Sequence, residues 1–172
     1  MTGAPVTPIV LVGAPGAGKS SVGRRVARGW DVPFRDSDQM IEADTGMSVA
    51  DIFVERGEVA FRELERATIA AALDGNGGVL ALGGGAVLDA RTRERLSAVP
   101  CVWLRVGAGE AARRVGLNTA RPLLLGNVRG TLVTMLDERT PLYEQVATWT
   151  VDTDGQTIDA VAAEVMRAVE GT

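Results

Sequence analysis

The apolar residues of the chain fall into two alternating patterns. Short, nearly continuous apolar runs are typical of buried strands, and they occur at 8–12, 33–35, 79–82, 101–106 and 149–151. Between them, apolar residues recur every three or four positions, which predicts amphipathic helices. These helical segments lie at 19–29, 39–46, 48–57, 58–73, 91–98, 128–139 and 158–169, with another starting near 110. Strands that alternate with helices predict an α/β fold built on a parallel sheet.

The connection between the first predicted strand and the first predicted helix carries the clearest chemical signal. Residues 13–20 read Gly-Ala-Pro-Gly-Ala-Gly-Lys-Ser and fit the phosphate-loop pattern G-x-x-x-x-G-K-[ST] at every fixed position. Glycines let backbone N–H groups approach phosphate oxygens, and the helix N-terminus adds a partial positive charge. We therefore expect a nucleoside triphosphate here, with Lys19 reaching its terminal phosphates and the Ser20 hydroxyl offered to magnesium. The alternative, a glycine-rich turn without a ligand, fits the flanking strand and helix less well.

The amino-acid composition limits the chemistry available to this site. Histidine is absent, so acid–base catalysis falls to carboxylates or to Lys19. Lys19 is also the only lysine, beside seventeen arginines. An ammonium group is a compact point charge that the planar guanidinium cannot replace in a tight loop.

Length and charge narrow the class of protein. A chain of 172 residues predicts one domain. The formal charge of −4 and the lack of a basic run argue against a nucleic-acid partner, and we expect no signal peptide, no membrane span and a monomer. The single cysteine, Cys101, is expected in the core and cannot form an internal disulfide, which favours a reducing cytoplasm.

Two carboxylates follow the second predicted strand. Asp36 and Asp38 are two residues apart, so both side chains can face the same side at a strand end. Ligands of open α/β sheets bind beyond the carboxyl ends of the strands, which places these carboxylates beside the phosphate loop. One would hold magnesium through water, and the other would accept a hydrogen bond or a proton from an acceptor hydroxyl. Capping of the following helix by Asp38 is the structural alternative.

The third predicted strand runs directly into Gly83, Gly84 and Gly85. Three consecutive glycines cost backbone entropy, so a close approach is the expected reason for them. We expect a ligand to meet bare backbone N–H groups here, with a simple tight turn as the alternative.

Three arginines are candidates for binding anions. Arg62 lies in Phe-Arg-Glu-Leu-Glu, and Arg139 precedes Thr-Pro-Leu-Tyr. Either one alone would be interpreted as a surface arginine. Arg121 precedes Pro122 in a segment without periodicity, and we expect it to be a loop cation that reaches a transferring phosphate.

Taken together, these segments resemble shikimate kinase over roughly residues 8–170. The phosphate loop is shared with many kinases, so the distinctive part is the collinear order of the other motifs. These are Asp36-Ser37-Asp38, Phe61-Arg62-Glu63-Leu64-Glu65, Leu82-Gly83-Gly84-Gly85-Ala86, Asn118-Thr119-Ala120-Arg121-Pro122-Leu123 and Arg139-Thr140-Pro141-Leu142-Tyr143.

The resemblance implies an activity and an architecture. The activity is ATP-dependent phosphorylation of the 3-hydroxyl of shikimate, on the route to chorismate and the aromatic amino acids. The architecture is a nucleoside-monophosphate-kinase-like three-layer α/β fold with a five-stranded parallel sheet in the order 2-3-1-4-5. A substrate-binding helical region at about 37–65 and a lid at about 114–127 would belong to the same domain.

The resemblance also implies roles for individual residues. Arg62 and Arg139 would bind the shikimate carboxylate bidentately, while Asp38 and the glycine run would meet its hydroxyls. Arg121 would close over the transferring phosphoryl group opposite Lys19. Mg²⁺ would be held by Ser20 and Asp36. ATP would be contacted by Gly16, Ala17, Gly18, Lys19, Ser20, Ser21, Arg114, Arg121 and Gln156.

Three other functions compete with this interpretation. Gluconate kinase also phosphorylates a small molecule that pairs a carboxylate with hydroxyls, but the glycine run and the segment from Arg139 to Tyr143 argue against it. A nucleoside-monophosphate kinase would need a second base pocket, which nothing in the sequence suggests. A catalytically silent nucleotide-binding module would have no reason to retain the full set of Lys19, Ser20, Asp36, Asp38 and Arg121.

Overall fold

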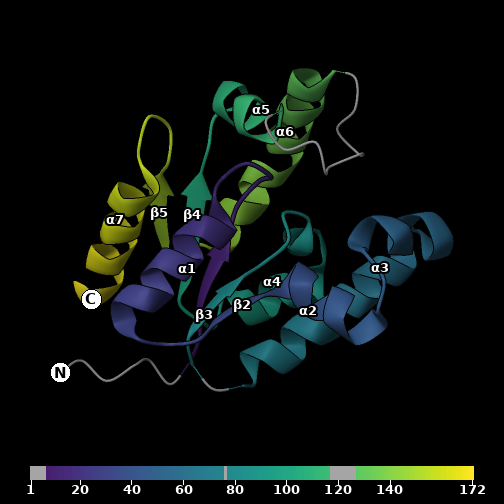
Figure 1. Ribbon diagram of the computed structural model, residues 1–172, viewed down its shortest axis with the longest axis horizontal. Coiled ribbons are helices and arrows are strands. Elements are labelled where there is room, and N and C mark those ends of the chain that lie inside the picture. The colour runs from purple at the N-terminus through teal and green to yellow at the C-terminus, as the bar shows by residue number, and fades with distance from the viewer. Residues whose placement is uncertain (1–6, 76, 117–126) are drawn as a thin grey trace.

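Five short parallel strands form one sheet at the centre of the protein (Figure 1). The computed structural model describes residues 7–75, 77–116 and 127–172. The sheet order is β2-β3-β1-β4-β5, which confirms the predicted fold class and strand order. The strands are β1 (Ile9–Val12), β2 (Phe34–Asp36), β3 (Val79–Ala81), β4 (Cys101–Arg105) and β5 (Trp149–Asp152).

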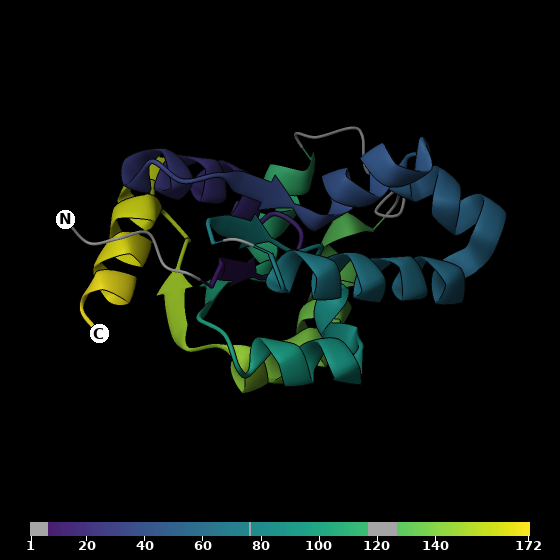
Figure 2. The same ribbon diagram turned by 90° about the horizontal axis from the view of Figure 1, so that it is seen from below.

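Helices cover both faces of this sheet. Figure 2 shows α1 on one side, with α7 packed beside it, and α4 and α6 on the other side. The helices are α1 (Lys19–Trp30), α2 (Ser37–Thr45), α3 (Val49–Leu73), α4 (Ala90–Leu96), α5 (Ala108–Gly116), α6 (Val128–Val146) and α7 (Ile158–Glu170). A short 3₁₀ turn, η1 (Ala86–Leu88), follows the glycine run and was not predicted.

Strand β1 lies at the centre of the core because its neighbours cover it on every side. All four of its residues are buried, and Leu11 pairs with Ala81 of β3 and Val102 of β4. Parallel strands end at the same edge of a sheet, so the segments after β1, β2 and β3 meet there. This edge holds the phosphate loop, the two aspartates and the glycine run.

Helix α6 extends further than its sequence predicts. The predicted helix at 128–139 continues through Pro141 to Val146. A proline inside a helix costs about 3 kcal/mol because it cannot donate to the carbonyl one turn earlier. Tyr143 and Val146, which are 0% and 2% exposed, bury the last turn of the helix against the core. That burial offsets the lost hydrogen bond.

Helix α3 contains the break that the sequence places at Gly57. The backbone is non-helical there, so the predicted segments at 48–57 and 58–73 form two arms of one interrupted helix. Helix α2 and both arms of α3 form a small apolar cluster of Ile41, Ile52 and Phe61, separate from the main core. This region therefore has its own packing at the end of the sheet nearest β2 (Figure 1).

The described ranges contain no helix that combines the length and the apolar character needed to cross a bilayer.

We expect Cys101 to stay unreactive toward a thiol reagent in the folded protein at pH 8. The side chain is fully buried in β4, and burial raises the pKa of its thiol to about 12, whereas the thiolate is the reactive form. Titration with a chromogenic disulfide should label one thiol per chain only after guanidinium chloride is added. Rapid labelling in native buffer would contradict the burial of this strand.

Candidate active site

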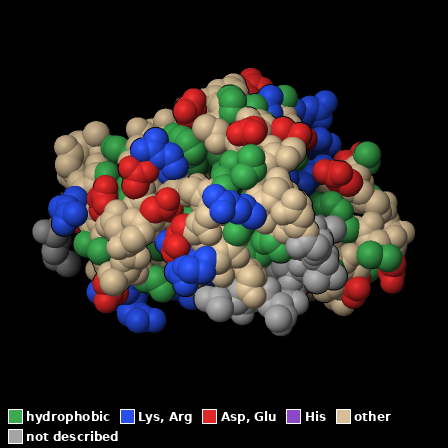
Figure 3. All heavy atoms as spheres, turned by 90° about the horizontal axis from the view of Figure 1, so that it is seen from above, with side chains coloured by type: hydrophobic (Ala, Val, Ile, Leu, Met, Phe, Trp, Pro, Cys, Tyr) green, Lys and Arg blue, Asp and Glu red, His purple; other side chains and the backbone are tan. Residues whose placement is uncertain are grey.

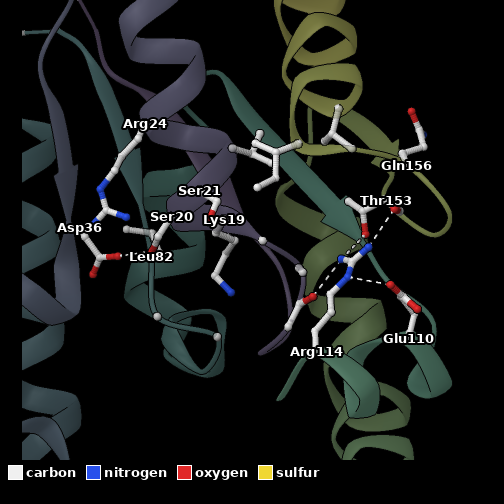
Figure 4. Close-up of a pocket in the computed structure, with 18 of the residues that line it drawn as sticks. Lys19, Ser20, Ser21, Arg24, Asp36, Leu82, Glu110, Arg114, Thr153 and Gln156 are labelled. Carbon is white, nitrogen blue, oxygen red and sulfur yellow. Dashed lines mark hydrogen bonds and ion pairs between the residues drawn. The ribbon is translucent and has the colours of Figure 1, made fainter. Parts of the chain in front are cut away.

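A crevice of about 550 Å³ opens at the carboxyl ends of the strands. Figure 4 shows Lys19, Ser20 and Asp36 on one side of it and Glu110, Arg114 and Gln156 on the other. The phosphate loop runs between the two groups. The crevice is therefore long enough to connect the aspartates to the loop after β5.

The phosphate loop presents a cation and a helix N-terminus to this crevice. Gly18 precedes α1 with a φ of 87°, a conformation that favours glycine, and it lets the chain turn from the loop into the helix. The Lys19 ammonium donates to the carbonyl oxygens of Gly13 at 2.7 Å and Ala14 at 3.0 Å. Lys19 is thereby held over its own loop, where a triphosphate would be bound.

Asp36 joins the end of β2 to the phosphate loop. Its Oδ2 accepts a hydrogen bond from the Ser20 hydroxyl at 2.7 Å, while its Oδ1 accepts from the N–H groups of Asp38 and Gln39. Asp36 therefore caps α2, and the alternative in which Asp38 is the cap is wrong. The reason is geometric, since Asp36 still has extended backbone angles and Asp38 already lies inside the first helical turn.

Ser20 and Asp36 offer a hydroxyl and a carboxylate oxygen, which are ligands that Mg²⁺ prefers. No cluster of three or more His, Cys, Asp or Glu residues capable of holding a metal occurs in the described part of the chain. A divalent cation beside this pair would depend on oxygens from water and bound phosphate, as Mg²⁺ commonly does.

The three glycines face three different groups of the protein. A Cβ atom on Gly83 would stand 2.7 Å from Oδ1 of Asp38, and one on Gly85 would stand 2.7 Å from Cζ of Arg62. A Cβ atom on Gly84 would stand 3.0 Å from Cδ of Pro15 and 3.4 Å from Nη1 of Arg139. Side chains of the protein therefore lie close to all three glycines, a crowding that the sequence does not predict. The run also forms the tight turn that was the alternative to ligand binding, since the N–H of Ala86 donates to the carbonyl of Gly83 at 3.0 Å.

Arg62 is paired with Glu65, a residue to which the sequence assigns no role. Arg62 Nη1 donates to Glu65 Oε1 at 2.8 Å, and the guanidinium lies 5.3 Å from the centre of the Phe61 ring. Glu65 is only 2% exposed, and burial raises its pKa while the attraction of Arg62 opposes the shift. The spacing of three residues on one helix is the signal that could have revealed this pair.

Arg114 connects the phosphate loop to the loop after β5. Its Nη1 donates to Gly16 O at 3.0 Å and to Thr153 Oγ1 at 3.1 Å, and its Nε donates to Glu110 at 3.0 Å. Hydrogen bonds from Arg113 and Arg114 lower the pKa of Glu110 to about 2. Gln156 lies at the same end of the crevice, where its amide donates to the Asp152 carbonyl. This end is polar and carries a fixed guanidinium.

Most of the site residues predicted from the sequence surround one space. The crevice is lined by Gly16, Ala17, Gly18, Lys19, Ser20, Ser21, Asp36, Asp38, Gly83, Gly84, Arg114 and Gln156. Arg62, Gly85 and Arg139 lie immediately beyond its glycine wall. Arg121 falls outside the described residues. Arg24 is a further lining residue that sequence reasoning missed, and it points toward Asp36 in Figure 4.

The surface around the strand ends carries mixed charge. In the face shown in Figure 3, arginines are interspersed with aspartates and glutamates, and the described residues form no continuous basic patch there.

A family model described as shikimate kinase matches residues 15–170. A shikimate kinase of Frankia casuarinae is 54% identical over 89% of this chain and 68% of its own length. The corresponding protein of Saccharopolyspora erythraea is 50% identical over 93% of this chain and 92% of its own length.

Solved structures agree with the sequence relatives. Shikimate kinase from Acinetobacter baumannii, solved in complex with shikimate, is 34% identical and superposes with a TM-score of 0.93 over 98% of this chain and 95% of its own. Shikimate kinase from Aquifex aeolicus is 25% identical, with a TM-score of 0.83 over 95% of this chain and 96% of its own. The likeness extends over nearly the whole of each chain.

Proposed function

Because the chain belongs to the shikimate kinase family, we propose that it transfers the γ-phosphoryl group of ATP to the 3-hydroxyl of shikimate, giving shikimate 3-phosphate and ADP. The observation that carries this proposal is the convergence of an anion-binding loop and an acceptor pocket on one crevice. The acceptor side of the crevice is lined by Asp38 and the backbone of Gly83 and Gly84, and the guanidinium groups of Arg62 and Arg139 lie next to the same glycine run.

On the donor side, the phosphate loop would bind the triphosphate through its backbone N–H groups and Lys19. The Lys19 ammonium would exchange its hydrogen bonds to the Gly13 and Ala14 carbonyls for hydrogen bonds to phosphate oxygens. It would then neutralise negative charge during phosphoryl transfer. Arg114 and Gln156 would contact the nucleoside end, a role supported by their place at the far end of the crevice.

On the acceptor side, Arg62 and Arg139 would bind the carboxylate of shikimate. The support is that both guanidinium groups lie against the glycine run, one beside Gly85 and one beside Gly84. Asp38 would hold the 3-hydroxyl and accept its proton as the oxygen attacks the γ-phosphorus and the bond to the β-phosphate oxygen breaks. Glu65 would keep Arg62 in place.

Ser20 and Asp36 would hold Mg²⁺, which would neutralise phosphate charge when it binds with ATP. The region at about 37–65 would form the substrate-binding arm, which its separate apolar cluster supports. The lid at about 114–127 and the role of Arg121 stay predictions from the family resemblance. A cytoplasmic location and a monomeric state likewise belong to this proposal.

The direct test is an assay that couples ADP release to NADH oxidation, with shikimate and gluconate offered separately. We expect magnesium-dependent turnover with shikimate and none with gluconate. Turnover with gluconate alone would replace the proposal with its nearest rival. Nucleotide binding without turnover on either acceptor would support a silent nucleotide-binding module.

Replacing Arg62 with alanine is expected to weaken shikimate binding by about 2–5 kcal/mol and to leave ATP binding nearly unchanged. The replacement removes one of two guanidinium groups beside the glycine run and leaves Glu65 buried without its partner. Calorimetric titration with each substrate measures both affinities. Arg66→Ala is the matched control, since Arg66 is on the same helix but pairs with Asp89 outside the crevice. An unchanged affinity for shikimate in Arg62→Ala would remove Arg62 from the acceptor site.

A further inference from the structure

A buried phenol hydroxyl holds the backbone of the glycine run. Tyr143 of α6 is 0% exposed, and its hydroxyl donates to the carbonyl oxygen of Gly84 at 2.6 Å. Its ring stacks on Trp103 of β4 with 5.8 Å between the ring centres, so the hydroxyl has little freedom to move. Burial raises the pKa of this phenol to about 12, which keeps it a neutral hydrogen-bond donor at neutral pH.

A second buried hydroxyl contacts the same run from α2. Ser37 is also 0% exposed, and its Oγ accepts a hydrogen bond from the N–H of Gly83 at 3.0 Å. Ser37 stands directly between Asp36 and Asp38, which were both predicted to act in the site. The hydroxyl therefore ties the glycine run to the segment that carries the aspartates.

Among the described residues, most backbone polar groups of the three glycines form hydrogen bonds with the protein, and two N–H groups do not. The carbonyls of Gly83 and Gly85 accept from Ala86 and Leu88, each at 3.0 Å. With the Tyr143 and Ser37 contacts, all three carbonyls and the N–H of Gly83 have protein partners. Within the described part of the chain, the N–H groups of Gly84 and Gly85 donate to no protein acceptor. Gly84 is half-buried at the crevice and Gly85 is buried, and a buried backbone N–H is normally paired, so both groups can donate to a bound ligand.

Because a peptide group is planar, the hydrogen bond from Tyr143 also sets the direction of the Gly85 N–H group. The Gly84 carbonyl and the Gly85 N–H belong to one planar trans peptide and point in opposite directions. A carbonyl held by the buried phenol therefore turns the Gly85 N–H away from the core. We propose that Tyr143 and Ser37 are positioning residues for the acceptor, which set the glycine backbone so that the Gly84 and Gly85 N–H groups bind shikimate between Asp38, Arg62 and Arg139. This inference rests on the proposed function.

The test is steady-state kinetics of Tyr143→Phe and Ser37→Ala with both substrates varied. Phenylalanine keeps the ring and its stacking on Trp103 but leaves the Gly84 carbonyl without its donor. We expect the KM for shikimate to rise about tenfold in each variant and kcat to fall by less, because the lost contact acts in the ground state and the transition state alike. The KM for ATP should stay within about twofold of the wild-type value. Calorimetry with shikimate alone should show the same tenfold loss.

Val146→Ala provides the matched control for simple destabilisation. Val146 is on the same helix and 2% exposed, and it is not among the residues nearest to the Cβ positions of the three glycines. Its variant should unfold at a lower temperature with both KM values unchanged. An unaltered KM for shikimate in Tyr143→Phe, or equal rises in both KM values, would overturn the inference. If Tyr143→Phe does not fold, the KM values of Ser37→Ala for shikimate and ATP test the inference in the same way. Lack of shikimate turnover in the wild-type enzyme would instead refute the proposed function.

Discussion

Asp38→Asn is expected to lower kcat about 10²–10⁴-fold while the dissociation constant for ATP stays within about twofold. Asparagine has nearly the same shape but cannot take a proton from the attacking hydroxyl. Asp38 lines the crevice, and its Oδ1 lies against the glycine run, where the acceptor would bind. Ser20 of the phosphate loop pairs with Asp36 and Gly16 with Arg114, and both contacts remain in the variant, so nucleotide binding should survive.

Single-turnover measurements of phosphoryl transfer, together with calorimetric titration by ATP, would check this result. Asp44→Asn is a matched control because it makes the same change at an exposed position of α2. We expect near wild-type turnover from the control. A kcat within a few-fold of wild type in Asp38→Asn would show that this carboxylate neither accepts the proton nor orients the hydroxyl.

Lys19→Met should reduce kcat/KM for ATP by about 10³-fold or more, and Lys19→Arg should not restore it. Methionine keeps an unbranched side chain only one atom shorter, but it removes the charge and the hydrogen-bond donors. Arginine keeps the charge, but the ammonium sits 2.7 Å and 3.0 Å from two carbonyls of its own tight loop. A planar guanidinium does not fit that arrangement as a point charge does.

The unusual composition of the chain offers an independent measurement for Lys19. It is the only lysine, so an amine-acylating reagent has one side-chain target besides the terminal amino group. We expect inactivation to accompany modification of Lys19, and ATP to slow it. Arg28→Met, which removes a positive charge from the exposed far end of α1, serves as the control variant. Activity that survives complete acylation of Lys19 would contradict its role.

The sequence alone determined the features that depend on short-range pattern. The phosphate loop, its strand and its helix are visible because their residues are adjacent, and apolar periodicity placed each strand within a few residues of its observed position. The break at Gly57 was likewise a local signal. The sheet order and the collinear set of site residues came from the family resemblance and not from periodicity.

Other features depended on partners far apart in the chain. The Ser37 contact to Gly83 joins residues 46 positions apart, and the Tyr143 contact to Gly84 joins residues 59 apart. No local pattern specifies such pairs, because they form only when α2 and α6 pack against the sheet edge. The continuation of α6 through Pro141 has the same origin, since burial of Tyr143 outweighs the local preference to stop.

The glycine run shows the difference between what the sequence predicts and what the tertiary structure decides. From the sequence, three consecutive glycines indicate that something approaches closely, and a ligand is the natural candidate. The tertiary structure shows that Asp38, Pro15 and Arg62 lie nearest in the directions in which side chains on the three glycines would point. Only the folded chain could decide this, because sterics and hydrogen bonding at that edge are set by helices that lie far from the glycines in sequence.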